Sequence, residues 1–86
     1  MEIIAHAGNT AAPAYFALVA AGFSVTSNSQ QHGELLWYAE RGDLRLIADG
    51  PVELAGLAFM RLSRGINWKA SDSQIAEFLD KFGHSL

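Results

Sequence analysis

After Glu2, the first third of the chain carries no charged side chain. Between Ile3 and Gly33 the sequence contains no Lys, Arg, Asp or Glu, although the whole chain has six basic and nine acidic residues. A helix that faces water on one side normally displays charged side chains there, because those groups remain hydrated. We therefore expect an Ala-rich helix inside this segment to be covered on more than one side.

The length of the chain allows a single domain. A chain of 86 residues buries only about 60–65% of the surface that its unfolded form exposes, which leaves a thin margin of stability. Half of the residues are hydrophobic and 17% are charged, a composition that builds a core. The absence of Cys excludes disulfides and thiolate metal sites. Packing must supply the stability, including packing against a second copy of the chain.

The charge and the apolar runs argue against two classes of partner. The net charge of −3 and the pI of 5.4 disfavour attraction to nucleic-acid phosphates. The longest apolar run, Ala11–Val25, contains Pro13 and Gly22 and falls short of the about 20 residues that a membrane span needs. Glu2 stands where a signal peptide would be positively charged. These features predict a soluble, cytoplasmic protein with no nucleic-acid or membrane partner.

The N-terminal half predicts a strand, a helix and a second strand. The Ile-rich run Glu2–Ala7 favours a strand, and the helix that follows is expected over Ala11–Ala21. Thr10 can cap this helix, and Gly22 can end it. Phe23–Thr26, rich in β-forming residues, predicts the second strand.

The centre of the chain predicts a β-hairpin. Two apolar runs, Glu34–Glu40 and Leu44–Ala48, flank a turn formed by Arg41, Gly42 and Asp43. Strands joined by so short a loop must be antiparallel.

Two helices with clear end signals follow the hairpin. The first begins near Asp49, Gly50 and Pro51 and ends at Gly65. The second begins after Ser71, where Gln74 completes a capping box. The resulting order β-α-β-β-β-α-α predicts a small single-domain α+β fold over residues 1–86, with a mixed sheet and the helices packed on one face.

The residues before the first helix form a candidate ligand site. The N-terminus of a helix presents unpaired N–H groups and a partial positive charge, and Gly8 would let a ligand approach the backbone. His6, Asn9 and Thr10 could add contacts to a small molecule or an anion. A purely structural interpretation explains the same residues, since Gly8 and Asn9 suit a turn and Thr10 suits a cap.

Catalytic and metal-binding patterns are missing from the sequence. His6, His32 and His84 lie in three unrelated places, and no closely spaced pair of metal ligands occurs. The carboxylates are scattered or lie in first helical turns, where the helix dipole explains them. We therefore predict a protein that is not an enzyme and that needs neither a metal nor a cofactor.

Apolar residues on several sides of the predicted elements indicate association. Tyr15, Leu18 and Val19 point in different directions around the first helix, while Leu36 and Tyr38 make the second face of their strand apolar. A monomer of this length has difficulty covering such surfaces, and exposed apolar patches often mark interfaces. We expect a protein-interaction module that forms a homodimer through these five residues. The ligand site before the first helix remains the alternative function.

Most of the chain resembles a group of short bacterial proteins of unassigned function. The resemblance rests on the stretches HAGNTAAPAYFALVAAGF, ADGPVEL and GLAFMRLSRGINWKASDSQIAEFL. It implies a bacterial source, but no activity, cofactor or site residue. In general character the small, acidic, single domain is also similar to immunity and antitoxin proteins, which implies another bacterial protein as an alternative partner.

Overall fold

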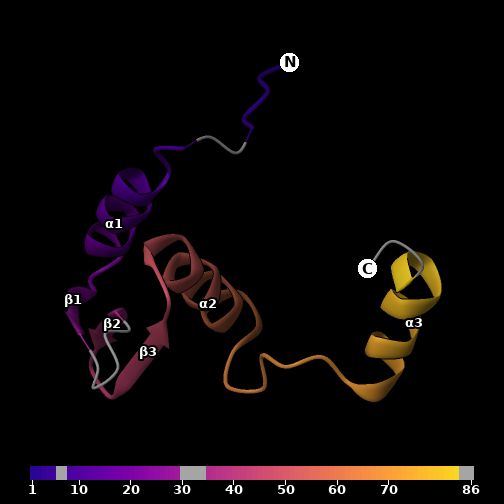
Figure 1. Ribbon diagram of the computed structural model, residues 1–86. Coiled ribbons are helices and arrows are strands. Elements are labelled where there is room, and N and C mark those ends of the chain that lie inside the picture. Colours follow the sequence, from indigo (N-terminus) through magenta and orange to yellow (C-terminus); the bar gives the residue numbers. More distant parts are fainter. Residues whose placement is uncertain (6–7, 30–34, 84–86) are drawn as a thin grey trace.

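Three helices and one three-stranded sheet form the regular structure of the described part of the chain. The computed structural model describes residues 1–5, 8–29 and 35–83. In chain order the elements are α1 (Ala11–Ala20), β1 (Ser24–Ser29), β2 (Leu35–Arg41), β3 (Leu44–Ala48), α2 (Pro51–Arg64) and α3 (Asp72–Phe82). Figure 1 shows α1, α2 and the sheet together, with α3 set apart from them. The predicted α+β class is confirmed.

The sheet is an antiparallel meander in the order β1-β2-β3. The predicted hairpin is confirmed, because Arg41 pairs with Leu44 and leaves a two-residue loop of Gly42 and Asp43. The φ of Gly42 is +60°, which suits the first loop residue of a type II′ turn and is strained for a residue with a Cβ atom. This glycine therefore fixes the register of the hairpin.

The end signals of α2 and α3 are confirmed. Pro51 occupies the first turn of α2, and Gly65, with a φ of +82°, ends this helix. At the start of α3 the Ser71 side chain accepts a hydrogen bond from the Gln74 backbone, and the Gln74 side chain accepts one from the Ser71 backbone at 3.0 Å. Such local chemistry determines where a helix starts and stops without help from tertiary contacts.

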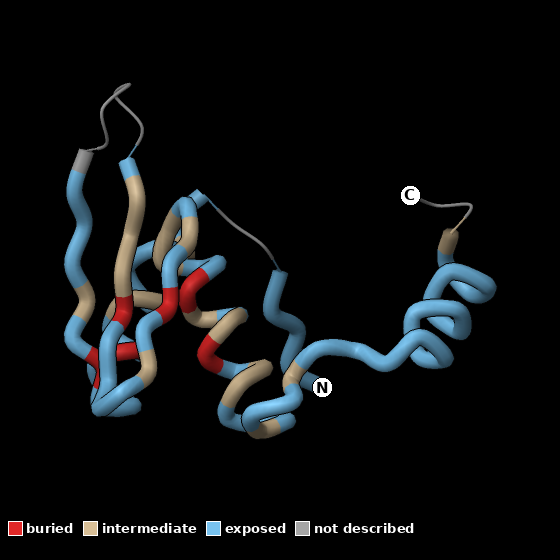
Figure 2. The backbone as a smooth tube through the Cα atoms, turned by 90° about the horizontal axis from the view of Figure 1, so that it is seen from below, coloured by how far each residue is buried: buried red, intermediate tan, exposed pale blue. Residues whose placement is uncertain are grey.

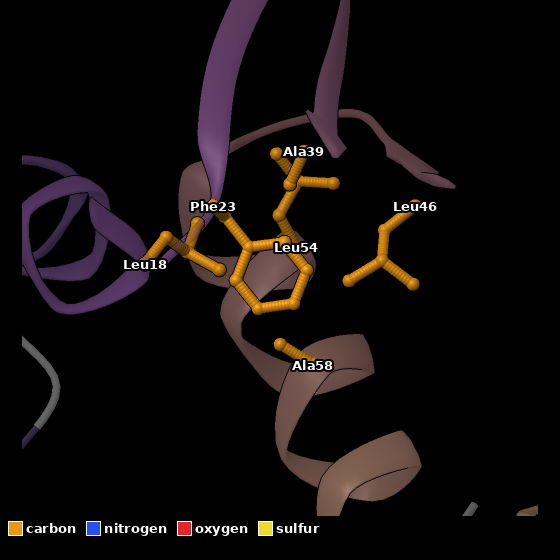
Figure 3. Close-up of a cluster of buried hydrophobic side chains, with 6 residues drawn as sticks. All are labelled: Leu18, Phe23, Ala39, Leu46, Leu54 and Ala58. Atoms are coloured by element: carbon orange, nitrogen blue, oxygen red, sulfur yellow. The ribbon is translucent and has the colours of Figure 1, made fainter. Parts of the chain in front are cut away.

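Helices α1 and α2 cover one face of the sheet, and the core lies between the two layers (Figure 2). The buried side chains come from α1 and α2, from the residue just before β1 and from the two strands of the hairpin (Figure 3). They are Leu18, Phe23, Ala39, Leu46, Leu54 and Ala58. Leu54 is fully buried and lies at the centre of this small core.

Three parts of the predicted architecture need correction. Residues 1–5 form no strand, and Ile3 and Ile4 are 83% and 86% exposed; residues 6 and 7 of the predicted strand lie outside the described residues. Without that strand the sheet is antiparallel rather than mixed. Helix α3 does not pack on the sheet, and all of its residues are exposed. The apolar pattern of these segments indicated that their side chains need cover. It did not show which surface would cover them.

The chain exposes more surface than a compact monomer of its mass. Its accessible surface is 6827 Å², whereas a folded monomer of 9.3 kDa exposes about 5,000 Å². Its radius of gyration is 15.3 Å, against about 12 Å for a compact domain of this length. Helix α3 and residues 1–5 extend away from the core (Figure 1) and contribute to this surplus of about 1,800 Å².

Candidate interaction surfaces

The predicted ligand site before α1 is open and lacks convergent polar groups. Gly8 and Asn9 are exposed, and a Cβ atom added to Gly8 would meet nothing within 4 Å. Thr10 occupies the N-cap position, where its carbonyl accepts a hydrogen bond from the Ala14 backbone at 3.1 Å, but its side chain forms no capping bond. His6 lies outside the described residues. The three described residues are neighbours in sequence, and open space surrounds Gly8.

The pocket beside the first turn of α1 is apolar. It has a volume of about 360 Å³ and is lined by Ala11, Ala12, Tyr15, Phe16, Trp37 and Pro51. The rings of Tyr15 and Phe16 meet edge to face, with centroids 5.0 Å apart. This surface suits an apolar side chain and offers no charged group to an anion.

The five predicted interface residues lie in three different places. Leu18 is 2% exposed and belongs to the core. It cannot contact a partner, so its prediction as an interface residue is wrong. Tyr15 lines the apolar pocket beside α1, and Val19 is 44% exposed. Leu36 and Tyr38 lie on the face of the sheet that α1 and α2 do not cover, and each is half-buried.

The outer face of the sheet is partly covered by its own charged side chains. The register places Ile47 beside Tyr38 on this face. The Arg45 guanidinium lies 4.6 Å from the centre of the Tyr38 ring, and its Nε is 3.8 Å from Glu40 Oε2. The exposed apolar area on this face is therefore smaller than the sequence pattern indicated, and the charges of Arg45 and Glu40 cancel.

A second apolar surface, which we name the α2 ridge, consists of Phe59, Leu62 and Ile66. Their exposed fractions are 71%, 49% and 78%. Phe59 and Leu62 share one side of α2 at i, i+3 spacing, and Ile66 follows just beyond the end of the helix. Sequence reasoning missed the ridge, because apolar residues surround α2 and the pattern did not show which side the core would leave open.

Charged side chains border the α2 ridge at its C-terminal end. Leu62 and Ile66 line a pocket of about 490 Å³ together with Arg41, Asp43, Leu44 and Arg61. Two arginines face one aspartate there, so the border has a net positive charge. Arg41 is fixed in place, since its guanidinium donates to the Ala21 carbonyl at 2.9 Å and lies 5.0 Å from the Phe23 ring centre.

Helix α3 carries a third apolar surface, which we name the α3 stripe. Its members, at i, i+3, i+4 and i+7 spacing, are Ile75, Phe78, Leu79 and Phe82. Each is between 45% and 50% exposed, and the rings of Phe78 and Phe82 are 5.5 Å apart. The sequence predicted this amphipathic helix correctly, but the apolar side has no cover within the described part of the chain.

Arg64 joins α3 to the rest of the chain. Its Nε donates to the Trp68 carbonyl at 2.8 Å, and its Nη2 donates to Gln74 Oε1 at 3.0 Å. Trp68 in turn is half-buried against β3 and α2, in a pocket that it shares with Leu46 and Leu57. These contacts hold the start of α3 while the rest of the helix extends away.

Comparisons with known proteins give no relative for this chain: no family model, no curated protein and no solved structure matches it. Over the described residues no group of three His, Asp or Glu side chains could hold a metal ion, and all three histidines lie outside that part. Within the same residues no helix is long and apolar enough to cross a membrane. Function must therefore be argued from the surfaces.

Proposed function

We propose that the chain is a non-enzymatic protein-interaction module that works as a homodimer. The observation that carries this proposal is the large apolar surface that the fold leaves uncovered. Among the residues that the structure describes, fifteen large hydrophobic residues are exposed, against six residues in the core. Scattered exposed apolar residues are normal, but the α2 ridge and the α3 stripe are contiguous patches, and such patches mark interaction sites.

The amount of surplus surface fits a stable dimer. If two copies each cover their surplus of about 1,800 Å², the interface buries about 3,600 Å² in total, within the range of obligate homodimers. A transient encounter would cover less than about 1,200 Å². Association therefore accounts for both the exposed surface and the large radius of gyration of 15.3 Å.

A second copy is the best-supported partner, because one chain holds two complementary surfaces. The α3 helix is acidic and apolar, and the α2 ridge is apolar with a basic border. An immunity-like or antitoxin-like role, with another bacterial protein as partner, would use the same surfaces. The small-molecule or anion site has less support, since Gly8 and Asn9 are exposed and open space surrounds Gly8.

Sedimentation equilibrium tests the proposal directly. We expect a mass twice the 9.3 kDa of the chain over the micromolar range, with dissociation on dilution. The matched measurement adds the cell extract of the native host to tagged protein and identifies what is captured. A strict monomer at millimolar concentration would contradict the homodimer, and an equimolar complex with a different protein would replace it by the heteromeric alternative.

A further inference from the structure

We propose that the dimer forms by reciprocal docking, in which the α3 stripe of each copy packs on the α2 ridge of the other. This inference rests on the proposed homodimer and adds its geometry. A two-fold pair of this kind makes the same contact twice and closes on itself, so it does not extend into fibres. The occupant of each ridge is thus a defined segment of the second copy.

The two surfaces match in apolar character. Three exposed residues on the ridge face four half-exposed residues on the stripe. The stripe has the narrow apolar side of a helix that packs against another helix, and side chains at i, i+3 and i+4 positions interdigitate with those of a facing helix. The outer face of the sheet offers a poorer site, because Arg45 already covers part of Tyr38 there.

The net charges of α3 and of the ridge border are opposite. Helix α3 carries Asp72, Glu77 and Asp80 against Lys81, which gives it a net charge of −2; Glu77 and Asp80 lie on the side opposite the stripe, so they act on the ridge border at long range rather than by contact. The border of the ridge has a net positive charge, with Arg41 and Arg61 beside a single aspartate. Complementary charges orient two surfaces and raise the rate of association. On the outer sheet face, Glu40 and Arg45 neutralise one another, so that face gives the acidic helix no such attraction.

The start of α3 is held by hydrogen bonds from Arg64. Arg64 bonds both to the Trp68 carbonyl and to the Gln74 side chain while α3 extends away from α2 (Figure 1). An isolated helix of 11 residues is also marginal in water, because helices shorter than about 12–15 residues rarely persist without packing. Docking on a second copy would leave the Arg64 bonds in place and would give α3 the packing that it needs.

Cross-linking between engineered cysteines tests this geometry, since the natural chain has none. Ser63→Cys places a thiol beside Phe59 on α2, and Ala76→Cys places one beside the stripe; both positions are exposed. The two single variants are mixed and treated with a short bismaleimide. Thr26→Cys, exposed on the outer sheet face, replaces Ser63→Cys in the control mixture.

We expect several-fold more mixed cross-linked dimer from the Ser63→Cys and Ala76→Cys pair than from the control pair. A dimer in sedimentation that shows equal linking in both mixtures, or more in the control, overturns the reciprocal geometry and leaves the homodimer standing. Linking within a single chain that carries both cysteines, at nanomolar concentration, also overturns it, because α3 would then cover its own ridge. A monomer in sedimentation overturns the proposed function itself.

Discussion

Replacement of Phe59 by Gln separates association from folding. Phe59 lies on the α2 ridge and is 71% exposed. Full burial of a Phe side chain stabilises by up to about 3 kcal/mol, so cover from a partner contributes up to about 2 kcal/mol at this site. In a two-fold dimer the site occurs twice, which gives an upper value of about 4 kcal/mol. The dissociation constant should therefore rise between about 30-fold and 1,000-fold, depending on how much of the ring the partner covers.

The same substitution should leave the folded monomer almost unchanged. Gln has a good helix propensity, and the side chain at this position already contacts mostly water. Exposed substitutions of this kind usually change the free energy of unfolding by less than about 0.5 kcal/mol. Sedimentation velocity over a dilution series measures the dissociation constant. Thermal unfolding well below that constant measures the monomer alone.

Leu54→Ala is the matched control in the same helix. Leu54 is 0% exposed, and loss of its side chain should lower the free energy of unfolding by about 3–5 kcal/mol, because it removes buried apolar area and leaves a cavity. The melting temperature of this variant should fall at every concentration. The reasoning about Phe59 is refuted if Phe59→Gln dimerises as tightly as the natural chain, or if its monomer is destabilised as much as Leu54→Ala.

Three further predictions concern the turn, the capping box and the charges. Gly42→Ala should lower the free energy of unfolding by about 1–2 kcal/mol in urea titration, and Gly42→Asn by less, because Asn tolerates a positive φ better. Ser71→Ala should remove the capping box, at a cost of about 1 kcal/mol, and circular dichroism should show the helix loss most clearly in dilute solution. The double variant Glu77→Lys and Asp80→Lys should slow association in low salt, measured by stopped-flow mixing, and adding Arg61→Glu to the same chain should restore the rate, because these charges act at long range. Equal association rates of all three chains would contradict the charge complementarity.

The sequence predicted best those features that depend on neighbouring residues. Gly50 and Pro51 at the start of α2, and Ser71 with Gln74 at the start of α3, act through backbone groups a few residues away. The two-residue loop at Gly42 likewise determines its own hairpin. These elements were located within one or two residues, because nothing distant alters their chemistry.

Features that depend on distant contacts were harder to predict. The apolar run that contains Ile3 and Ile4 has the composition of a strand. A strand forms only where a neighbouring strand shares its hydrogen bonds, and the local sequence does not show which segment that neighbour would be. The interface prediction met the same limit. Leu18 and Val19 are adjacent in an apolar helix, yet one is in the core and the other is 44% exposed. The α2 ridge could have been found only through Ile66, an apolar residue just after the stop signal Gly65.

The stretch without charged side chains, residues 3–33, and the charged helix α3 contribute differently to one interface. Helix α1 buries Leu18, but its Phe16 and Val19 are 66% and 44% exposed with no charge beside them. Such a surface can add apolar area to an interface, but it cannot orient a partner. Helix α3 carries both an apolar stripe and a net charge of −2. Since charge complementarity governs orientation and association rate, while desolvated apolar contacts govern lifetime, recognition of the second copy is expected to depend on α3 and the arginines that border the ridge.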